Sequence, residues 1–275
     1  GYSQFLEMYE LKKRQIEQAY KKQQKEIAHL EDFVARNKAR IATTNMAKSR
    51  QKKLDKMDVI TIERDKPKPQ FYFKTARTPS REVITVKDLI IGYDEPLTRK
   101  LNFTIERNQK IAIRGVNGLG KSTLINTILR KIKAISGEIE HGQFLEVGYF
   151  KQEEESSGKT ALDEFWDEFP SLTNGEVRSA LAKCGLTKDH IGTKMRALSG
   201  GENAKVRLAK IMNHEINFLV LDEPTNHLDI DAKDELKRAL KEFKGTVFIV
   251  SHEPEFYMDI VTDVWNVEDW TTKII

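Results

Sequence analysis

Cysteine and long apolar runs are nearly missing from this chain of 275 residues. Its one cysteine, Cys184, excludes a disulfide framework and predicts a small, partly buried side chain in a reducing, cytoplasmic setting. The longest apolar runs span four to five residues, as in residues 218–221 and 247–250. A membrane-spanning helix needs about 20 apolar residues, so we expect no membrane insertion. Residues 1–10 contain two glutamates and no apolar core, unlike a signal peptide.

Proline and glycine are also absent from residues 5–34, where apolar side chains recur at a spacing of three and four. This pattern predicts a long amphipathic helix with a coiled-coil-like stripe. A second helix is expected over residues 39–57, so that the two fold back as an antiparallel hairpin with its tip near residues 36–44. Pro67 and Pro69 end the helical region, because proline lacks an N–H donor and favours extended backbone before it.

A different domain is expected over residues 71–275, after a hairpin of residues 1–70. Short strand patterns come first, at residues 71–73, 83–86 and 103–105. Later strands alternate with helices, which is typical of a layered α/β domain with an antiparallel part at its start.

Charge divides the chain unevenly. Residues 1–70 contain 17 Lys and Arg against 10 Asp and Glu, a net +7, which leaves −3 for the remainder. Within 21 residues of the hairpin, Asp55 is the only acid among eight bases: Arg36, Lys38, Arg40, Lys48, Arg50, Lys52, Lys53 and Lys56. Such clusters are typical of polyanion binding. A solvated face of a charged helix is the alternative, and the residues alone leave both open.

The motif with the most specific chemistry occupies residues 115–123 and reads G-x-x-x-x-G-K-[ST]. A short apolar strand pattern precedes it and a helical pattern follows it, which favours a phosphate-binding loop over a chance glycine-rich turn. Lys121 is expected to reach the β- and γ-phosphates of a nucleotide, and the Ser122 hydroxyl to bind Mg²⁺. The residues of this loop expected to bind ATP are Asn117, Gly118, Gly120, Lys121, Ser122 and Thr123.

Two acids follow the apolar run of residues 218–221, which predicts a buried strand that delivers carboxylates to a site at its end. In a P-loop protein the first acid, Asp222, should hold Mg²⁺, and the second, Glu223, should polarise the attacking water. A strand end capped by acids for solubility is the alternative. The P-loop about 100 residues upstream favours the chemical interpretation.

A second phosphate cradle is predicted at Ser199, Gly200 and Gly201, which precede a well-formed helical pattern over residues 203–212. Amide donors and the helix dipole at such an N-terminus favour a phosphate. One P-loop needs only one cradle, so the second implies that two such domains share nucleotides.

Together these motifs resemble the nucleotide-binding domain of an ABC ATPase. By this resemblance, Ser199, Gly200 and Gly201 form the signature loop that contacts a γ-phosphate held by a partner domain. Residues 224–229 then correspond to the D-loop. The partner would be a first ABC domain of a longer chain or a second copy of this one.

Three further residues gain a role from the resemblance. Gln152 matches the Q-loop glutamine, a catalytic and Mg²⁺-binding position, and His252 matches the switch histidine that contacts the γ-phosphate. Tyr93, 28 residues before Lys121, suits the aromatic residue that stacks on adenine. Each of the three is, taken alone, more often a packing or surface residue.

The stretch DEPTNHLD at residues 222–229 is similar to that of the ABC-F family. The resemblance covers nearly the whole chain and implies a linker hairpin that meets ribosomal RNA and tRNA, followed by the second of two ABC domains. A fragment of a longer protein is therefore expected. Glu253 and Pro254 depart from the family's usual Asp-Arg, which leaves His252 intact and puts the following loop in doubt.

Two other classes share these nucleotide motifs. A transporter's ATPase subunit would not need the hairpin, and an SMC- or Rad50-like ATPase would have a very long coiled coil where only 77 residues separate Lys121 from Leu198. An ABC-F translation factor is therefore the leading hypothesis. Whether it serves general translation or antibiotic resistance stays open.

Overall fold

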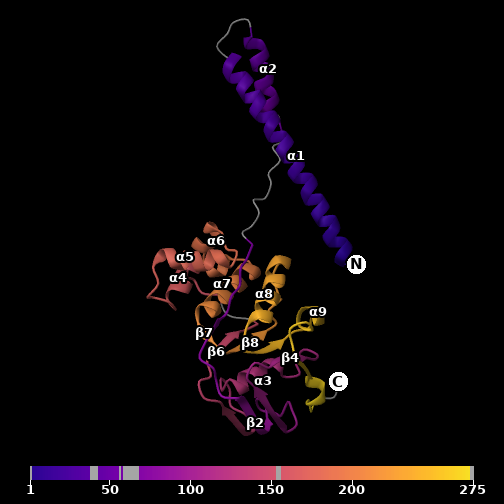
Figure 1. Ribbon diagram of the computed structural model, residues 1–275, viewed down its shortest axis with the longest axis vertical. Coiled ribbons are helices and arrows are strands. Elements are labelled where there is room, and N and C mark those ends of the chain that lie inside the picture. The colour runs from indigo at the N-terminus through magenta and orange to yellow at the C-terminus, as the bar shows by residue number, and fades with distance from the viewer. Residues whose placement is uncertain (1, 38–42, 56, 58–67, 153–155, 273–275) are drawn as a thin grey trace. The chain divides into compact units, whose positions relative to one another are not determined.

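A computed structural model describes residues 2–37, 43–55, 57, 68–152 and 156–272. The chain divides into two compact units, Gly1–Asp65 and Lys66–Ile275, and each is described by itself (Figure 1).

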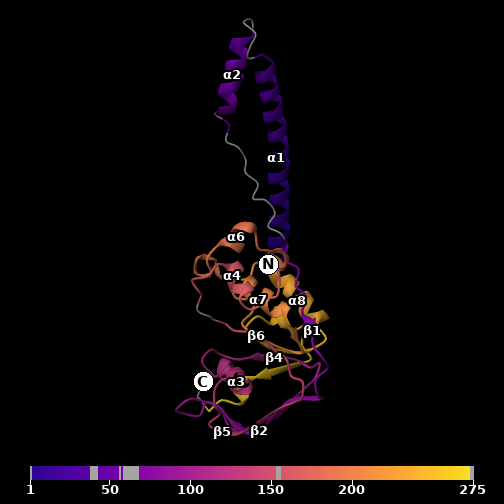
Figure 2. The same cartoon turned by 90° about the vertical axis from the view of Figure 1, so that its left-hand side faces the viewer.

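The first unit is a helical hairpin of α1 (Tyr2–Asn37) and α2 (Thr44–Asp55), which run side by side (Figure 2). The Arg50 guanidinium lies 3.5 Å from the centroid of the Phe33 ring, and Lys53 Nζ lies 2.7 Å from Glu26 Oε1. Residue numbers thus rise along α2 while those of their partners fall along α1. This geometry confirms the predicted antiparallel hairpin.

The hairpin's contact face is small and apolar. Leu30 and Val34 of α1 and Ala47 of α2 are buried, and Ala47 lets the two helices approach closely. The first helix extends three residues beyond its predicted range at each end, whereas the second begins at Thr44 rather than residue 39. Residues 39–42 of that prediction lie outside the described residues.

The second unit is built around a five-stranded sheet in the order β10-β4-β9-β8-β6, with every neighbouring pair parallel. Its strands are β4 (Lys110–Arg114), β6 (Val147–Phe150), β8 (Phe218–Asp222), β9 (Thr246–Val250) and β10 (Asp263–Asn266). This is the layered α/β fold that the sequence predicted.

Apolar side chains of the inner strands alternate between two cores. In β9, Val247 and Ile249 join one core, while Phe248 and Val250 join the other. In β8 the same alternation separates Leu219 from Val220. The inner strands are continuous apolar runs because a parallel sheet is covered on both faces.

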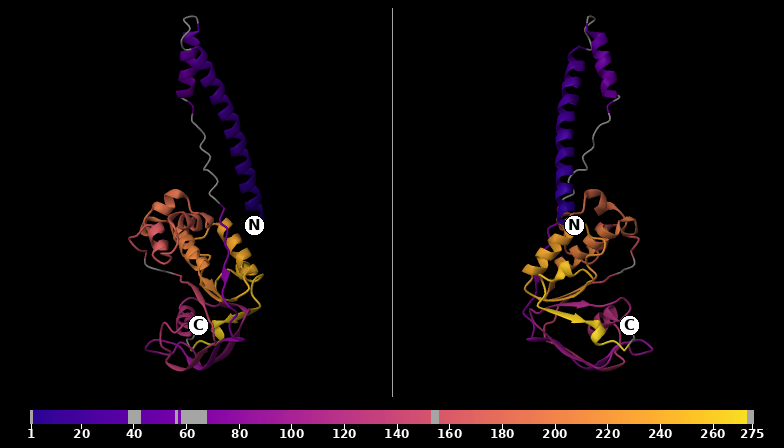
Figure 3. Two further views of the ribbon diagram at one scale, coloured as in Figure 1. Left: turned by 60° about the vertical axis from the view of Figure 1, so that its left-hand side comes forward. Right: turned by 90° about the vertical axis from the view of Figure 1, so that its right-hand side faces the viewer.

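Two different layers cover these faces (Figure 3). One contains the helices α4 (Ala161–Trp166), α5 (Asn174–Lys183), α6 (Lys188–Gly192), α7 (Gly200–Asn213), α8 (Ile230–Glu242) and α9 (Pro254–Tyr257). The other contains α3 (Lys121–Ile128) and an antiparallel sheet of β3 (Leu101–Glu106), β2 (Glu82–Ile90) and β5 (Ser136–His141). Helical turns at Met195–Ala197 and Val267–Asp269 and a pair of two-residue strands, β1 (Lys74–Thr75) and β7 (Glu215–Ile216), complete the unit.

The strand predicted at residues 71–73 is wrong. Phe71 and Phe73 are buried, but their segment is not a strand, and β1 starts only at Lys74. Side chains take the backbone donors instead: Phe71 N–H donates to Glu235 Oε1 and Tyr72 N–H to Met212 Sδ. The alternating aromatics therefore report burial against helices rather than strand pairing. The strands predicted at residues 83–86 and 103–105 lie within β2 and β3.

Asn217 joins three segments at the start of β8. Its side chain is buried, donates to the carbonyl oxygens of Arg77 and Phe144, and accepts the Glu146 N–H at 2.9 Å. Backbone groups without a partner in a dry interior cost free energy. This one amide therefore stabilises two loops against the central sheet.

Replacing Asn217 with Ala is expected to lower the free energy of unfolding by about 3 kcal/mol, because three buried backbone groups lose their partner. Urea unfolding followed by circular dichroism measures the change. Asn174→Ala, at an exposed helix position, serves as the control and should shift stability by less than about 0.5 kcal/mol. Equal effects in the two variants would contradict the role of Asn217.

Candidate functional site

Four loops meet at the carboxyl edge of the parallel sheet because their strands are neighbours in register. Asp222 pairs with Val250 across β8 and β9, and Val250 pairs with Ile113 of β4. The P-loop follows β4, Glu223 follows β8 and His252 follows β9, while Gln152 comes two residues after β6. Open parallel sheets bind ligands at this edge.

Lys121, the first residue of α3, points back into its own loop. Its ammonium donates to the carbonyl oxygens of Gly115 and Val116 at 2.6 and 3.3 Å and to Asn117 Oδ1 at 3.2 Å. Burial lowers the pKa of Lys121, and the charges of Glu223 and Asp222 oppose that shift. The cation is thus held by oxygen atoms in a partly dry loop.

His252 reaches the same loop from the other side. Its Nε2 atom lies 2.7 Å from Asn117 Oδ1, 2.9 Å from Lys121 Nζ and 3.1 Å from Glu223 Oε1. Depending on the tautomer, Nε2 either donates to Asn117 Oδ1 or accepts from the Lys121 ammonium. One imidazole atom therefore contacts the P-loop lysine and the acid after β8 together.

Asp222 faces Ser122 across the site. The Ser122 hydroxyl donates to Asp222 Oδ2 at 2.8 Å, and Asp222 is only 2% exposed. Burial raises the pKa of Asp222, and the Ser122 hydrogen bond and the Lys121 charge oppose that rise. A hydroxyl and a carboxylate this close offer oxygen ligands of the kind that Mg²⁺ prefers.

Glu223 is the most constrained residue of the site. It is 6% exposed, and its backbone has φ of 49°, in the left-handed region that a residue with a side chain adopts at a cost. Its N–H donates to the Val250 carbonyl at 2.9 Å, which holds this conformation. Burial raises the pKa of Glu223, against the charges of His252 and Lys121. Among the described residues, its buried Oε1 atom has no hydrogen-bond partner.

The P-loop leaves space for an anion. Gly118 and Gly120 have φ of 81° and 98°, and a Cβ atom on Gly118 would meet nothing within 4 Å. Thr123 is buried in the first turn of α3, one residue after Ser122. Backbone N–H groups at a helix N-terminus favour phosphate, so the geometry of this loop is compatible with a nucleotide phosphate.

The fit to Mg²⁺ rests on few protein ligands. Within the described ranges, no group of three or more His, Cys, Asp or Glu side chains could hold a metal ion. Mg²⁺ commonly uses one or two protein oxygens together with phosphate oxygens and water. Ser122 and Asp222 match that pattern when a nucleotide supplies the remaining oxygens.

Two predicted residues lie near this site without contacting it. Tyr93 is 69% exposed in the loop after β2, and Leu97 of the same loop is 3.3 Å from where a Gly120 Cβ would be. Gln152 is exposed at the sheet edge that carries Asp222. Both side chains are exposed to solvent and are not buried in the core.

The predicted signature loop is a separate feature. Ser199 caps α7 in a capping box with Glu202, and Ser199, Gly200 and Gly201 line a polar hollow of about 360 Å³ with His227 and Asp229. None of the P-loop residues lines this hollow. The hollow beside the predicted signature loop is therefore separate from the P-loop.

Sequence reasoning missed two cations of α7. Lys205 is 6% exposed and lies 2.6 Å from Asp229 Oδ2, while Arg207 donates to the Lys151 carbonyl and stacks on Phe150 at 4.5 Å. The sequence signal was the apolar context of Lys205 between Ala204 and Val206, which indicates a buried position but not which residue would pair with the lysine.

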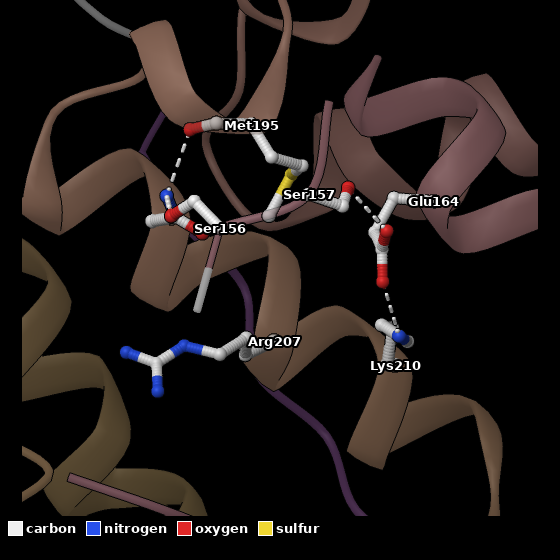
Figure 4. Close-up of a pocket in the computed structure, with 7 residues that line it drawn as sticks. Ser156, Ser157, Glu164, Met195, Arg207 and Lys210 are labelled. Atoms are coloured by element: carbon white, nitrogen blue, oxygen red, sulfur yellow. Dashed lines mark hydrogen bonds and ion pairs between the residues drawn. The ribbon is translucent and has the colours of Figure 1, made fainter. Parts of the chain in front are cut away.

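A small polar pocket lies beside Arg207, between α4 and α7 (Figure 4). Ser157 and Lys210 both donate to Glu164, and Asn203 donates to Ser156 Oγ and to the Met195 carbonyl. These hydrogen bonds attach the segment after β6 to α4 and α7.

Comparison with known proteins agrees with this geometry. Two family profiles, both described as "ABC transporter", match residues 98–226 and 1–73. The chain is 60% identical over its full length to the "Uncharacterized ABC transporter ATP-binding protein YfmM" of Bacillus subtilis. It is 37% identical over 91% of its length to "ABC transporter F family member 2" of Arabidopsis thaliana. The chain contains an ABC ATP-binding domain, and its relatives include ABC transporter F family members.

The fold is shared with solved ABC structures. The ATP-binding cassette MJ0796, in a dimeric post-hydrolysis state bound to ADP and Pi, aligns over 67% of this chain and 94% of its own, with a TM-score of 0.57 and 20% identity. The chain spans 53% of the length of the Bacillus subtilis relative and 38% of that of the Arabidopsis thaliana relative. In the described part of the chain, no helix is long and apolar enough to cross a bilayer.

Glu223→Gln is expected to raise the melting temperature of the nucleotide-free ABC domain by about 2 to 4 °C near neutral pH, the shift that about 1 kcal/mol produces in a domain of this size. Because the folded-state pKa is raised, the stability tied to this carboxyl is present below its ordinary pKa and is lost as pH rises through the folded value. The gain should therefore vanish at acidic pH.

Glu164→Gln is the matched control, and its expected effect on the melting temperature at neutral pH is opposite: a decrease rather than an increase. Although burial opposes it, hydrogen bonds from Ser157 and Lys210 lower the pKa of Glu164, so its charge stabilises the fold above its ordinary pKa. Thermal melts of both variants between about pH 4 and about pH 8 make the comparison. A Glu223→Gln variant that melts lower than the parent at neutral pH would contradict the assignment.

Proposed function

We propose that this chain binds Mg·ATP at the P-loop edge of its sheet and hydrolyses it. The observation that carries the proposal is the convergence of Lys121, Ser122, Asp222, Glu223 and His252 from three loops. The match to ABC ATP-binding proteins supports the same reaction.

Lys121 is the phosphate ligand in this proposal. Its ammonium is held by loop oxygens and lies beside His252, so the β- and γ-phosphates replace these contacts when ATP binds. Asn117, Gly118, Gly120 and Thr123 complete the cradle, and Tyr93 stacks on adenine. The helix N-terminus of α3 adds its dipole to the attraction for phosphate.

Ser122 and Asp222 would hold Mg²⁺, with Gln152 approaching from the end of β6. When bound, the ion neutralises charge on the phosphate oxygens. The 2.8 Å hydrogen bond between Ser122 and Asp222 holds both oxygen atoms at one point of the sheet edge, which supports their assignment to a single ion.

Glu223 is proposed as the general base and His252 as the group that senses the γ-phosphate. A buried carboxylate with a raised pKa takes a proton from water more readily than an exposed one. Its buried Oε1 atom accepts no hydrogen bond from the described residues, which supports its assignment as the acceptor of that proton. The contact of 3.1 Å with His252 Nε2 orients the carboxylate.

Hydrolysis is proposed to need a second ABC domain, either the first domain of a longer chain or a second copy. No P-loop residue lines the hollow beside Ser199, Gly200 and Gly201, which supports a phosphate supplied by a partner domain. The chain's partial coverage of its relatives supports the longer-chain alternative.

We further propose that residues 1–70 form a linker that binds ribosomal RNA and tRNA, in a cytoplasmic ABC-F translation or antibiotic-resistance factor. The hairpin, its net charge of +7 and the ABC-F relatives support this. A transporter subunit is the alternative, and it gives no reason for a basic hairpin.

Those bases of the predicted basic cluster that the structure describes divide into two groups. Arg50 and Lys53 are engaged by Phe33 and Glu26 within the hairpin, and Arg36 pairs with Asp32 at 2.9 Å. Lys48 and Lys52 are exposed on α2. Lys38, Arg40 and Lys56 lie outside the described residues. The exposed lysines are therefore the better candidates for binding phosphates.

Glu223→Gln should leave ATP affinity intact and reduce hydrolysis at least about a hundredfold, because the amide cannot accept the proton. Phosphate release at several protein concentrations measures the rate, and a fluorescent ATP analogue measures binding. Glu138→Gln, at an exposed position of β5 in the antiparallel sheet, is the control and should stay within about twofold of the parent. Unchanged turnover in Glu223→Gln would show that another group is the base.

Changing Lys48 and Lys52 to Gln should weaken ribosome binding and lower the salt slope by about 0.7 to 0.9 for each phosphate that the protein no longer neutralises. Co-sedimentation with ribosomes across a salt series measures both. Lys21→Gln with Lys22→Gln removes the same charge from exposed positions outside the basic cluster and should change the slope less. Equal salt slopes in both double variants would contradict phosphate binding by Lys48 and Lys52, and would indicate that these charges only keep the surface soluble.

A further inference from the structure

The D-loop, residues 224–229, is attached to the signature helix α7 by one ion pair. Lys205 Nζ of α7 lies 2.6 Å from Asp229 Oδ2, and the Lys205 side chain is 8% exposed while that of Asp229 is 52% exposed. A buried ammonium is costly without a partner. Loss of the pair therefore costs more free energy at Lys205, which is buried, than at Asp229, which water can solvate.

Asp229 has a second task at the same point. Its Oδ1 atom accepts the Ala232 N–H at 2.8 Å and so caps α8, which begins at the next residue. One carboxylate thus joins α7 to the first turn of α8. Because the two oxygens serve different helices, the D-loop cannot shift without breaking one of these interactions.

Direct packing adds to the ion pair. A Cβ atom on Gly200 would lie 2.8 Å from the His227 ring, and one on Gly201 would lie 2.5 Å from the His227 carbonyl oxygen. His227 itself has φ of 70°, which brings its carbonyl toward the signature loop. The two loops are therefore in contact where both line the polar hollow.

We propose that Lys205 is a positioning residue that keeps the D-loop and the signature loop as one element, so that both meet a partner's nucleotide in a fixed geometry. This rests on the proposed hydrolysis at a shared site. Lys205 lines the hollow together with Ser199, Gly200 and Gly201, and the role assigned to it is to hold Asp229 rather than to bind a phosphate. Its removal is expected to lower turnover without changing the affinity of the chain's own P-loop for ATP.

Lys205→Met tests the proposal, with Lys210→Met as the matched control on the same helix. Lys210 is also paired, to Glu164 and Glu168 of the segment around α4, at 22% side-chain exposure. Hydrogen exchange of the nucleotide-free chain is measured over residues 224–233. We expect exchange to rise about tenfold there in Lys205→Met and to stay unchanged there in Lys210→Met.

Kinetics provide the second measurement. Lys205→Met should lower kcat about tenfold with KM within about twofold of the parent, and Lys205→Arg should recover most of both properties because it restores the charge. Asp229→Asn should destabilise the fold more than Lys205→Met, since it leaves the buried ammonium without its partner.

The outcomes are separable. Unchanged D-loop exchange in Lys205→Met, or an equal rise in Lys210→Met, overturns the attachment. Faster exchange with an unchanged kcat overturns the positioning role. If the parent chain does not hydrolyse ATP at any concentration, the proposed function fails, and the exchange measurement still decides whether Lys205 holds the D-loop.

Discussion

Burial of the parallel sheet on both faces is the constraint on which the rest of this domain depends. Strands β4, β8 and β9 contribute side chains to both apolar cores in strict alternation, so a slip of one residue would send each side chain to the opposite core. That register places Arg114, Asp222 and Val250 at one edge. The P-loop, the acids and the histidine are neighbours because the strands beneath them cannot slide.

The site contains several features that cost folding free energy, which the stable sheet beneath them offsets. Two buried acids with raised pKa values, a lysine with a lowered pKa and a left-handed glutamate backbone all oppose folding locally. Lys121, Asn117 and His252 satisfy one another in part, which limits the cost. In the proposed function, a nucleotide with Mg²⁺ offsets these costs, because the phosphates give Lys121 an anionic partner and the cation gives Asp222 a positive one.

Sequence patterns predicted the sheet and the P-loop because both depend on short-range chemistry: continuous apolar runs for β8 and β9, and glycine spacing before Lys121. Patterns failed where the partner is distant in sequence. Phe71 and Phe73 are buried in the core to which α7 and α8 also contribute side chains, rather than paired as a strand. No local pattern identifies Asp229 as the partner of Lys205. The exposure of Tyr93 and Gln152 also follows from tertiary structure, since a motif gives a residue's type and order but not its surroundings.

Cys184, buried at 1% exposure at the C-terminal end of α5, has a practical consequence for measurement. Burial raises the pKa of its thiol to about 12, so it carries almost no thiolate at neutral pH and reacts slowly with maleimides. A cysteine introduced on the surface would be the fast-reacting thiol of the molecule. The natural sequence is therefore already a background for site-specific fluorophores or spin labels, and its buried cysteine does not need to be removed.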